Sequence, residues 1–281
     1  MAAINATMTR VNGVFENDFA VTMVLIANND AVVYTNASTD PYGGNFNSEL
    51  QSTLTSVIGE ANYDIGHLFA KAGDNGNAGC IGCVCVNGSK GSGFTSRSTP
   101  QGDAFDIDYV AHEIGHQFGA NHTFSFRNES TNAHFEPGSG STIMGYAGIT
   151  GATDVQQNSD PYFHFFSIQQ VTNYVKSTSC QINTATGNAI PVVNAGADYT
   201  IPRGTPFVLT GQASDANGDS LTYCWEQADE NNAATTYPSV NGTTGVSFRS
   251  NNPSTSNQRY LPRLSTIKTG ATSWQWEAVP N

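Results

Sequence analysis

Three histidines and a glutamate fall between positions 112 and 122 of the chain. Residues four apart on an α-helix lie about one turn apart on the same side, so His112 and His116 can direct both imidazoles at one ion. Glu113 lies about 100° further round the helix, where it can contact a water but cannot be a third ligand beside them. With His122, three imidazoles and one water would form an open, catalytic zinc sphere. The spacing therefore predicts a zinc hydrolase.

Gly119 lies between the second and third histidines. Glycine readily adopts the left-handed conformation that ends a helix, so the chain can turn back there and bring His122 to the ion from a non-helical segment. The alternative is an amphipathic helix with incidental histidines. The chain holds only six histidines in 281 residues, and three of them occupy this stretch in register, which favours the metal motif.

The stretch HEIGHQFGANH matches HExxHxxGxxH, and the chain resembles the metzincin metallopeptidases that carry this signature. The segment from Ser141 to Tyr146 resembles the methionine-containing turn of the same clan. The resemblance covers residues 1–182 and favours a secreted bacterial peptidase of the reprolysin (adamalysin-like) type. Adamalysins carry an aspartate after the third histidine, whereas this chain has Thr123-Phe124, which is more similar to the pappalysin family. Both subfamilies stay open at this point.

The resemblance implies a zinc-dependent endopeptidase with an α/β/α catalytic domain and a twisted mixed sheet. Zinc held by the three histidines would lower the pKa of a water toward ~7, and Glu113 would take its proton and deliver it to the leaving amine. Met144 would form an apolar floor below the histidines without binding the ion. Astacins and serralysins have a tyrosine at the position of Tyr146 that can bind zinc. Tyr146 is therefore a candidate ligand or transition-state donor, with a purely structural tyrosine as the alternative.

Composition limits the partners of this protein. The formal net charge is -12 and only 12% of residues are charged, which argues against nucleic acid because binding phosphates needs a basic face. The sequence has no apolar run of about eighteen residues, so we expect no membrane span. We expect a monomer that acts on protein or peptide substrates. The family implies secretion, with a signal peptide and a propeptide absent from this chain.

Five cysteines are present, and Cys80 and Cys83 form a CxxC pair. A zinc knuckle needs a second such pair, which is missing, so disulfides in an oxidising compartment are the preferred interpretation. Adamalysins suggest a bond from the strand before the active-site helix to the C-terminal helix, here from Cys85 or a neighbour to Cys180. An odd number leaves one thiol over, and we expect this to be Cys224.

The elements that must position the motif follow from apolar periodicity. The active-site helix should begin with Asp106 or Asp108 as its N-cap and carry a buried stripe on the side away from the metal. We expect three further helices, at 5–15, from a cap at Asn47 or Ser48 to 62, and from a cap at Ser167 to 180. The predicted strands are a buried central strand at 20–27, a cleft-lining edge strand at 63–69 and a short strand at 83–86.

Three histidines lie outside the motif. His67 is predicted to be packed or at the rim of the cleft, and His164 to be structural. His134 could bind the ion only if His122 did not, so we expect it on a surface loop.

After a linker at 183–190, short strands separated by turn residues predict an all-β, immunoglobulin-like sandwich over 191–281, of the PKD or cadherin type. The chain as a whole would then be α+β followed by all-β. Asp215, Asn217 and Asp219 resemble a loop that binds Ca²⁺ in some such modules, and a plain turn between strands explains them equally well. A second hypothesis is that the sandwich is an adhesion module beside a degenerate peptidase, although the intact motif argues against this.

Overall fold

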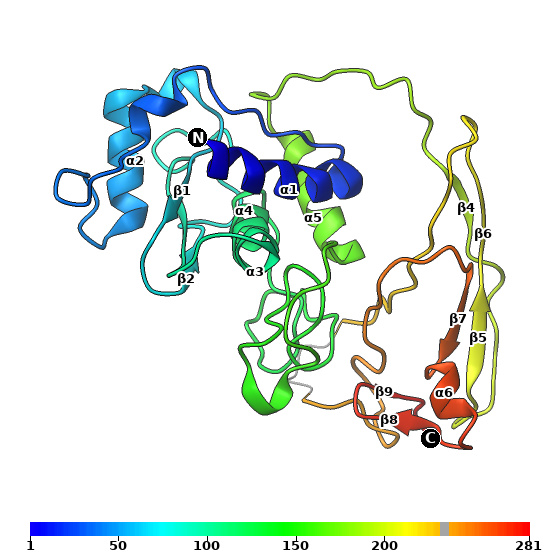
Figure 1. Cartoon of the computed structure of the whole chain (residues 1–281). Helices are drawn as coiled ribbons and strands as arrows, with labels where there is room; N and C mark the ends of the chain where they lie inside the picture. Colours follow the sequence, from blue (N-terminus) through cyan, green and yellow to red (C-terminus); the bar gives the residue numbers. More distant parts are fainter. Residues whose placement is uncertain (231–235) are drawn as a thin grey trace. The chain divides into compact units, whose positions relative to one another are not determined.

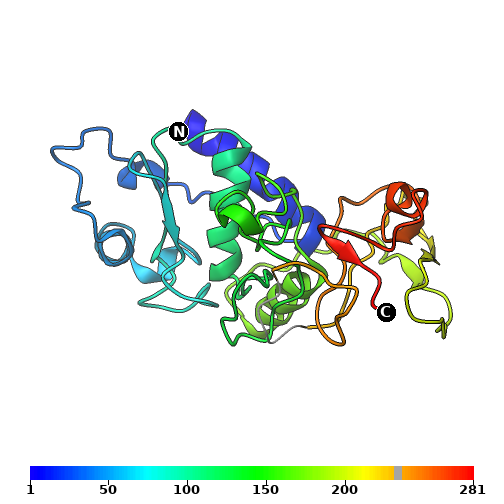
Figure 2. The same ribbon diagram turned by 90° about the horizontal axis from the view of Figure 1, so that it is seen from below.

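The computed structural model of the chain describes residues 1–230 and 236–281. The described residues divide into two compact units. The first unit comprises Met1–Asn121 and Pro161–Gln181, and the second comprises His122–Asp160 and Ile182–Asn281. Figures 1 and 2 show the chain from two directions. The sequence predicts a linker at 183–190 between two domains that fold independently, and this division stays a prediction.

Helix α1 (Ala2–Phe19) of the first unit buries Val11, Val14 and Phe15. The ring of Phe15 meets those of Phe118 and Phe163 at centroid distances of 5.5 and 5.3 Å, which places α1 beside the end of the helix that carries His112 and His116. Helix α5 (Phe165–Ser177) begins after His164, whose ring accepts the Phe166 N–H. The helix is confirmed, but its predicted cap at Ser167 is wrong, because Ser167 lies inside the helix.

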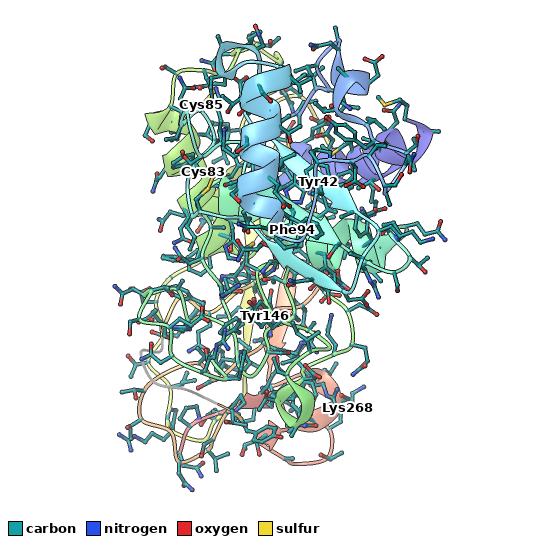
Figure 3. All side chains as sticks on the ribbon, turned by 90° about the vertical axis from the view of Figure 1, so that its left-hand side faces the viewer. Tyr42, Cys83, Cys85, Phe94, Tyr146 and Lys268 are labelled. Atoms are coloured by element: carbon teal, nitrogen blue, oxygen red, sulfur yellow. A yellow bond between two sulfur atoms is a disulfide. The ribbon has the colours of Figure 1, made fainter. Side chains whose placement is uncertain are left out.

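Helix α2 (Phe46–Val57) buries Leu50 and Leu54, as its apolar stripe predicts. It begins after Asn45, so the predicted cap at Asn47 or Ser48 is wrong. Its first turn meets the sheet through an edge-to-face chain of rings from Tyr42 through Phe46 to Phe94. Figure 3 labels the two ends of this chain, Tyr42 and Phe94. Single turns of 3₁₀-helix follow α1 and α2, at η1 (Asn29–Val32) and η2 (Glu60–Asn62).

The predicted buried strand at 20–27 is wrong. These residues form no strand, and Val24 is 82% exposed. The side chain of Asn12 on α1 donates to the Met23 carbonyl at 2.8 Å and accepts the Met23 N–H at 2.9 Å. A side-chain amide therefore satisfies the backbone groups that a neighbouring strand would otherwise have bound.

The sheet of the first unit has the order β1-β3-β2. Strand β1 (His67–Ala70) runs parallel to β3 (Gly93–Ser96), and β2 (Asn75–Asn77) runs antiparallel to it. The predicted strand at 63–69 is thus confirmed only at its end. The predicted strand at 83–86 is wrong, because these residues form a turn.

This turn belongs to a loop that carries both disulfides, Cys80–Cys83 and Cys85–Cys180 (Figure 3). The second bond is the one that the family resemblance implies, and the first removes the zinc-knuckle alternative. Cys224 is unpaired, as predicted. The loop also binds the end of the motif helix, since the N–H groups of Gly82 and Cys83 donate to the carbonyls of His116 and Gln117, each at 2.9 Å.

The motif helix is one continuous helical stretch made of α3 (Asp103–Phe105), the π-helical turn η3 (Asp106–Ala111) and α4 (His112–Gln117). It begins after Gly102, so the predicted caps at Asp106 and Asp108 are wrong. The predicted stripe is fully buried, at Ile107, Val110, Ala111, Ile114 and Phe118. Gly119 has a φ of 98°, as a turn out of the helix requires.

The described residues of the second unit contain η4 (Gly151–Thr153) and, after residue 190, three sheets of two strands each. No immunoglobulin-like sandwich is evident among the described residues of 191–281. The neighbours Val192 and Val193 are 71% and 70% exposed, so β4 buries neither of its faces. The elements of this stretch are β4 (Val192–Asn194) with β6 (Gln212–Ser214), β5 (Phe207–Thr210) with β7 (Gln258–Leu261), β8 (Ser273–Trp274) with β9 (Glu277–Ala278), and helix α6 (Leu264–Ile267).

Among the described residues, no helix is both long enough and apolar enough to cross a membrane.

Candidate metal centre

The three histidines of the motif converge in the folded chain. One ring nitrogen of each of His112, His116 and His122 lies within 4.8 Å of the others. Nitrogen donors at the usual ~2.1 Å from a tetrahedral zinc are about 3.4 Å apart, so small side-chain rotations would close this group on one ion. Two of the rings come from successive turns of one helix, with centroids 4.8 Å apart. The donor set fits zinc, because three imidazoles leave a fourth position open.

Hydrogen bonds determine which nitrogen of two of these rings is available. The Nδ1 atom of His116 lies 2.7 Å from the Ala120 carbonyl, which can only accept, so Nδ1 carries the proton. The Nδ1 atom of His122 lies 2.7 Å from a carboxylate oxygen of Glu129 and donates in the same way. Both rings therefore keep the Nε2 lone pair for a metal.

Glu129 lies between His122 and a cation. Its second oxygen accepts from the guanidinium of Arg127 at 2.6 Å. Partial burial works against ionisation, but the hydrogen bonds from His122 and Arg127 and the guanidinium charge of Arg127 outweigh it and lower the pKa of Glu129 to about 2. A negative charge thus faces the imidazole on the side opposite the metal position. Bonding of this kind orients a ligating histidine and raises its basicity.

Glu113 follows His112 on α4 and is 8% exposed. Burial raises the pKa of its carboxyl to about 8, against a hydrogen bond from the Ala78 backbone that lowers it. A side chain at Gly76 of β2 would come within 2.6 Å of a Glu113 oxygen, so the β2 backbone lies directly against this carboxyl. The edge strand beside the catalytic candidate is therefore β2, whereas the sequence predicts 63–69 for this role.

The methionine turn packs on the segment that follows His122. Met144 is fully buried, and its carbonyl accepts the N–H of Thr123 at 3.1 Å. Tyr146 is partly buried, and its ring centroid lies 4.4 Å from that of His122 at a steep angle. Tyr146 thus lies beside the third histidine. Figure 3 labels Tyr146 on the ribbon. Its role in binding zinc stays a prediction.

His67 of β1 is packed inside the first unit, as predicted. Gln117 of α4 offers its amide oxygen to Nδ1 of His67 at 2.8 Å, and Thr95 lies 2.9 Å from Nε2. Burial lowers the pKa of His67 to about 4, although the hydrogen bond with Gln117 raises it. His67 is therefore a neutral link between the sheet and the motif helix.

His134 does not lie on a surface loop, so that prediction is wrong. Its side chain is fully buried, with Nδ1 2.6 Å from the Phe124 carbonyl and Nε2 accepting the Glu129 N–H at 3.0 Å. It holds in place the loop that carries Glu129. His164 has the structural role predicted for it, as the residue that caps α5.

The predicted calcium loop contains a turn. One carboxylate oxygen of Asp215 accepts the N–H groups of Asn217 and Asp219 at 2.7 and 3.1 Å. This is the plain turn between strands that the sequence offers as the alternative to a Ca²⁺ loop. Binding of Ca²⁺ by Asp215, Asn217 and Asp219 stays a prediction.

A helix that offers two imidazoles and a buried carboxyl, followed by a turn that returns a third imidazole, is the arrangement of a hydrolytic metal centre. The family model of the metallopeptidase family M12B, reprolysin-like, matches residues 1–175, and the chain belongs to this family. Membership implies a zinc peptidase that acts on protein or peptide substrates. No curated protein gives a significant match to the chain. The two disulfides fit an oxidising compartment.

Proposed function

We propose that the protein is a secreted, metzincin-type zinc endopeptidase. The observation that carries the proposal is the convergence of donor nitrogens from His112, His116 and His122 beside a helix position occupied by Glu113. These three histidines would hold the ion, two of them through Nε2. When bound, Zn²⁺ supplies Lewis-acid chemistry, because it polarises a peptide carbonyl and lowers the pKa of a water.

Glu113 would act as general base and then as general acid. Its raised pKa, about 8 without a cation nearby, places proton uptake close to neutral pH, and a bound divalent cation would lower it again. The carboxylate takes a proton from the attacking water and delivers it to the leaving amine. The β2 backbone against Glu113 limits the movement of its side chain between these two steps.

Substrate would bind as an extended peptide along the free side of β2, since an edge strand can pair with one through backbone hydrogen bonds. A peptide in this position would pass Glu113, which touches Gly76 of the same strand. Met144 would support the site as a buried apolar residue. We assign Tyr146 to the same site as a transition-state donor or zinc ligand, supported by its position next to His122.

Removal and return of the metal tests this function. The protein should cleave a mixture of unstructured peptides, lose the activity in a chelator and regain it with one equivalent of Zn²⁺. A His116→Ala variant should not regain it. Cleavage that persists in the chelator, with no metal left in the protein, would contradict the proposal.

A further inference from the structure

Glu136 is a buried carboxyl group between the segment that follows His122 and the methionine turn. Its side chain is 1% exposed. One oxygen, Oε2, accepts the hydroxyl of Thr123 at 2.6 Å and that of Thr142 at 2.5 Å. Thr123 follows the third histidine directly, and Thr142 lies two residues before Met144. One oxygen atom therefore joins the two segments.

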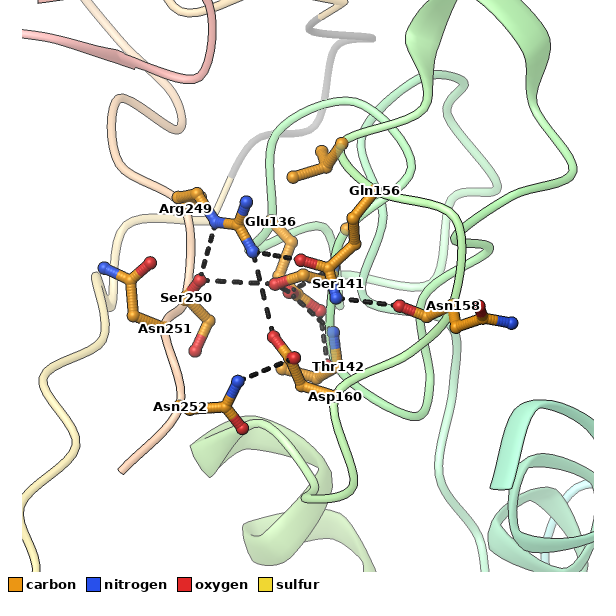
Figure 4. Close-up of polar contacts among 12 residues, drawn as sticks. Glu136, Ser141, Thr142, Gln156, Asn158, Asp160, Arg249, Ser250, Asn251 and Asn252 are labelled. Carbon is orange, nitrogen blue, oxygen red and sulfur yellow. Dashed lines mark hydrogen bonds and ion pairs between the residues drawn. The ribbon is translucent and has the colours of Figure 1, made fainter. Parts of the chain in front are cut away.

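The other oxygen of Glu136 binds the backbone of the methionine turn. Oε1 accepts the N–H groups of Ser141 and Thr142 at 2.8 and 3.2 Å and lies 3.4 Å from the Ser141 hydroxyl (Figure 4). Ser141 in turn donates its hydroxyl to the carbonyl of Ser250 at 3.2 Å. The methionine turn is therefore hydrogen-bonded to both Glu136 and Ser250.

Backbone bonds place the same residues in register. The Glu136 N–H donates to the Thr123 carbonyl at 2.9 Å, and the Thr123 N–H donates to the Met144 carbonyl at 3.1 Å. The side chain of Glu136 then uses both oxygens as acceptors for at least four donors. A carboxylate matches this demand, because it has about four lone-pair positions and no donor.

We propose that Glu136 is a positioning residue of the metal centre, which fixes the segment bearing the third histidine on the methionine turn. The inference rests on the proposed function of the three histidines. It also gives Thr123 a role, because its hydroxyl donates to a carboxyl group 13 positions further along the chain.

Cobalt binding tests the proposal in the full chain, because Co²⁺ reports ligand geometry through its visible absorption. Glu136→Ala should weaken Co²⁺ binding by about tenfold or more and change the absorption bands. Glu136→Gln keeps the shape and one acceptor oxygen, so it should restore part of the affinity. Thr123→Val removes a single hydroxyl at nearly constant volume, and should also weaken binding. If Glu136→Ala does not fold, Co²⁺ binding by Thr123→Val tests the positioning role instead.

Glu277→Gln is the matched control, since Glu277 is equally buried in the same unit but binds Arg259. It should change stability and leave the Co²⁺ spectrum unchanged. Wild-type affinity and spectrum in Glu136→Gln and Thr123→Val would overturn the positioning role. Unchanged Co²⁺ binding by His116→Ala would instead overturn the proposed metal site, so the two failures can be told apart.

Discussion

At the scale of single residues, the hydrogen bond from His122 to Glu129 gives a direct prediction. Glu129→Gln keeps an acceptor near Nδ1 but removes the negative charge that orients and polarises the ring. We expect the dissociation constant for Zn²⁺ to rise by about 10- to 100-fold in a competition titration with a chelating dye. Asp30→Asn, an exposed carboxylate on η1, is the control. Equal affinities for all three proteins would contradict this role of Glu129.

His67 gives a prediction for pH. Its pKa is about 4 in the folded chain and ~6.5 when unfolded, so the unfolded state binds the extra proton first as the pH falls. The contribution of His67 to stability is thus present above pH ~6.5 and lost as the pH falls through 4. Between these values the free energy of unfolding should fall by on the order of 3 kcal/mol, because each pKa unit corresponds to about 1.4 kcal/mol.

His67→Asn is the comparison, because its side chain does not titrate. Urea unfolding of both proteins at several pH values measures the difference in slope, with a chelator present to remove metal effects. Parallel pH curves for the two proteins would show that His67 is not the packed, neutral group described above.

The residues of the metal motif could be predicted because their spacing lies within one helix and one turn, where geometry is local. Glu129 and Glu136 could not. They lie in an irregular loop, and their partners depend on where that loop folds back, which no periodicity records. The same loop explains the wrong prediction for His134, since a polar, turn-rich stretch predicts a surface position although His134 is fully buried.

At the scale of elements, the contact of β2 with α4 is the most consequential. A methyl group at Gly76 would lie 2.6 Å from a Glu113 oxygen, so Gly76→Ala should displace the carboxyl group. We expect kcat/KM for peptide cleavage to fall by about tenfold or more, since misplaced catalytic groups lose rate steeply. Zinc content should not change. Gly73→Ala is the matched control, because nothing lies within 4 Å of a methyl group there. Equal rates for both variants would argue against this contact.

The regular elements with a clear apolar stripe were predictable, as α2 and the motif helix show. Residues 20–27 were not, because an apolar run of strand length says nothing about its partner. The side chain of Asn12 takes the place of a neighbouring strand at Met23. The predicted helix starts are wrong for a related reason. Asn47, Ser48 and Ser167 are residue types that favour the N-cap position, yet each lies inside a helix that begins earlier in the chain.

At the scale of the whole molecule, the second unit joins the methionine turn to residues near the C-terminus. Trp276 is buried. Its ring packs so closely on Gly138 that a Cβ atom at this glycine would lie 2.6 Å from a ring carbon. The ring of Tyr237 packs against that of Trp276 at a centroid distance of 5.1 Å, and its hydroxyl donates to the Ala152 carbonyl at 2.6 Å. The residues after the expected linker are thus packed on the segment that holds the methionine turn.

Trp276→Ala should therefore affect more than the C-terminal residues. We expect a loss of about 3–5 kcal/mol in the free energy of unfolding, the usual cost of truncating a buried tryptophan. Peptide cleavage should become less heat-resistant in parallel. Tyr199→Ala, at a ring that is 78% exposed, should change neither property. Unchanged heat resistance of cleavage in Trp276→Ala would favour an independent module over residues 191–281.

The central claim is that Glu113 moves the proton in a reaction at the three-histidine centre. Its most direct test is kcat/KM of Glu113→Gln on a peptide substrate, with zinc content measured on the same preparation. Gln keeps the size of the side chain and cannot accept the proton. We predict one zinc per chain and a kcat/KM lowered by about 10²- to 10⁴-fold. Wild-type kcat/KM in a fully zinc-loaded Glu113→Gln protein would contradict the mechanism.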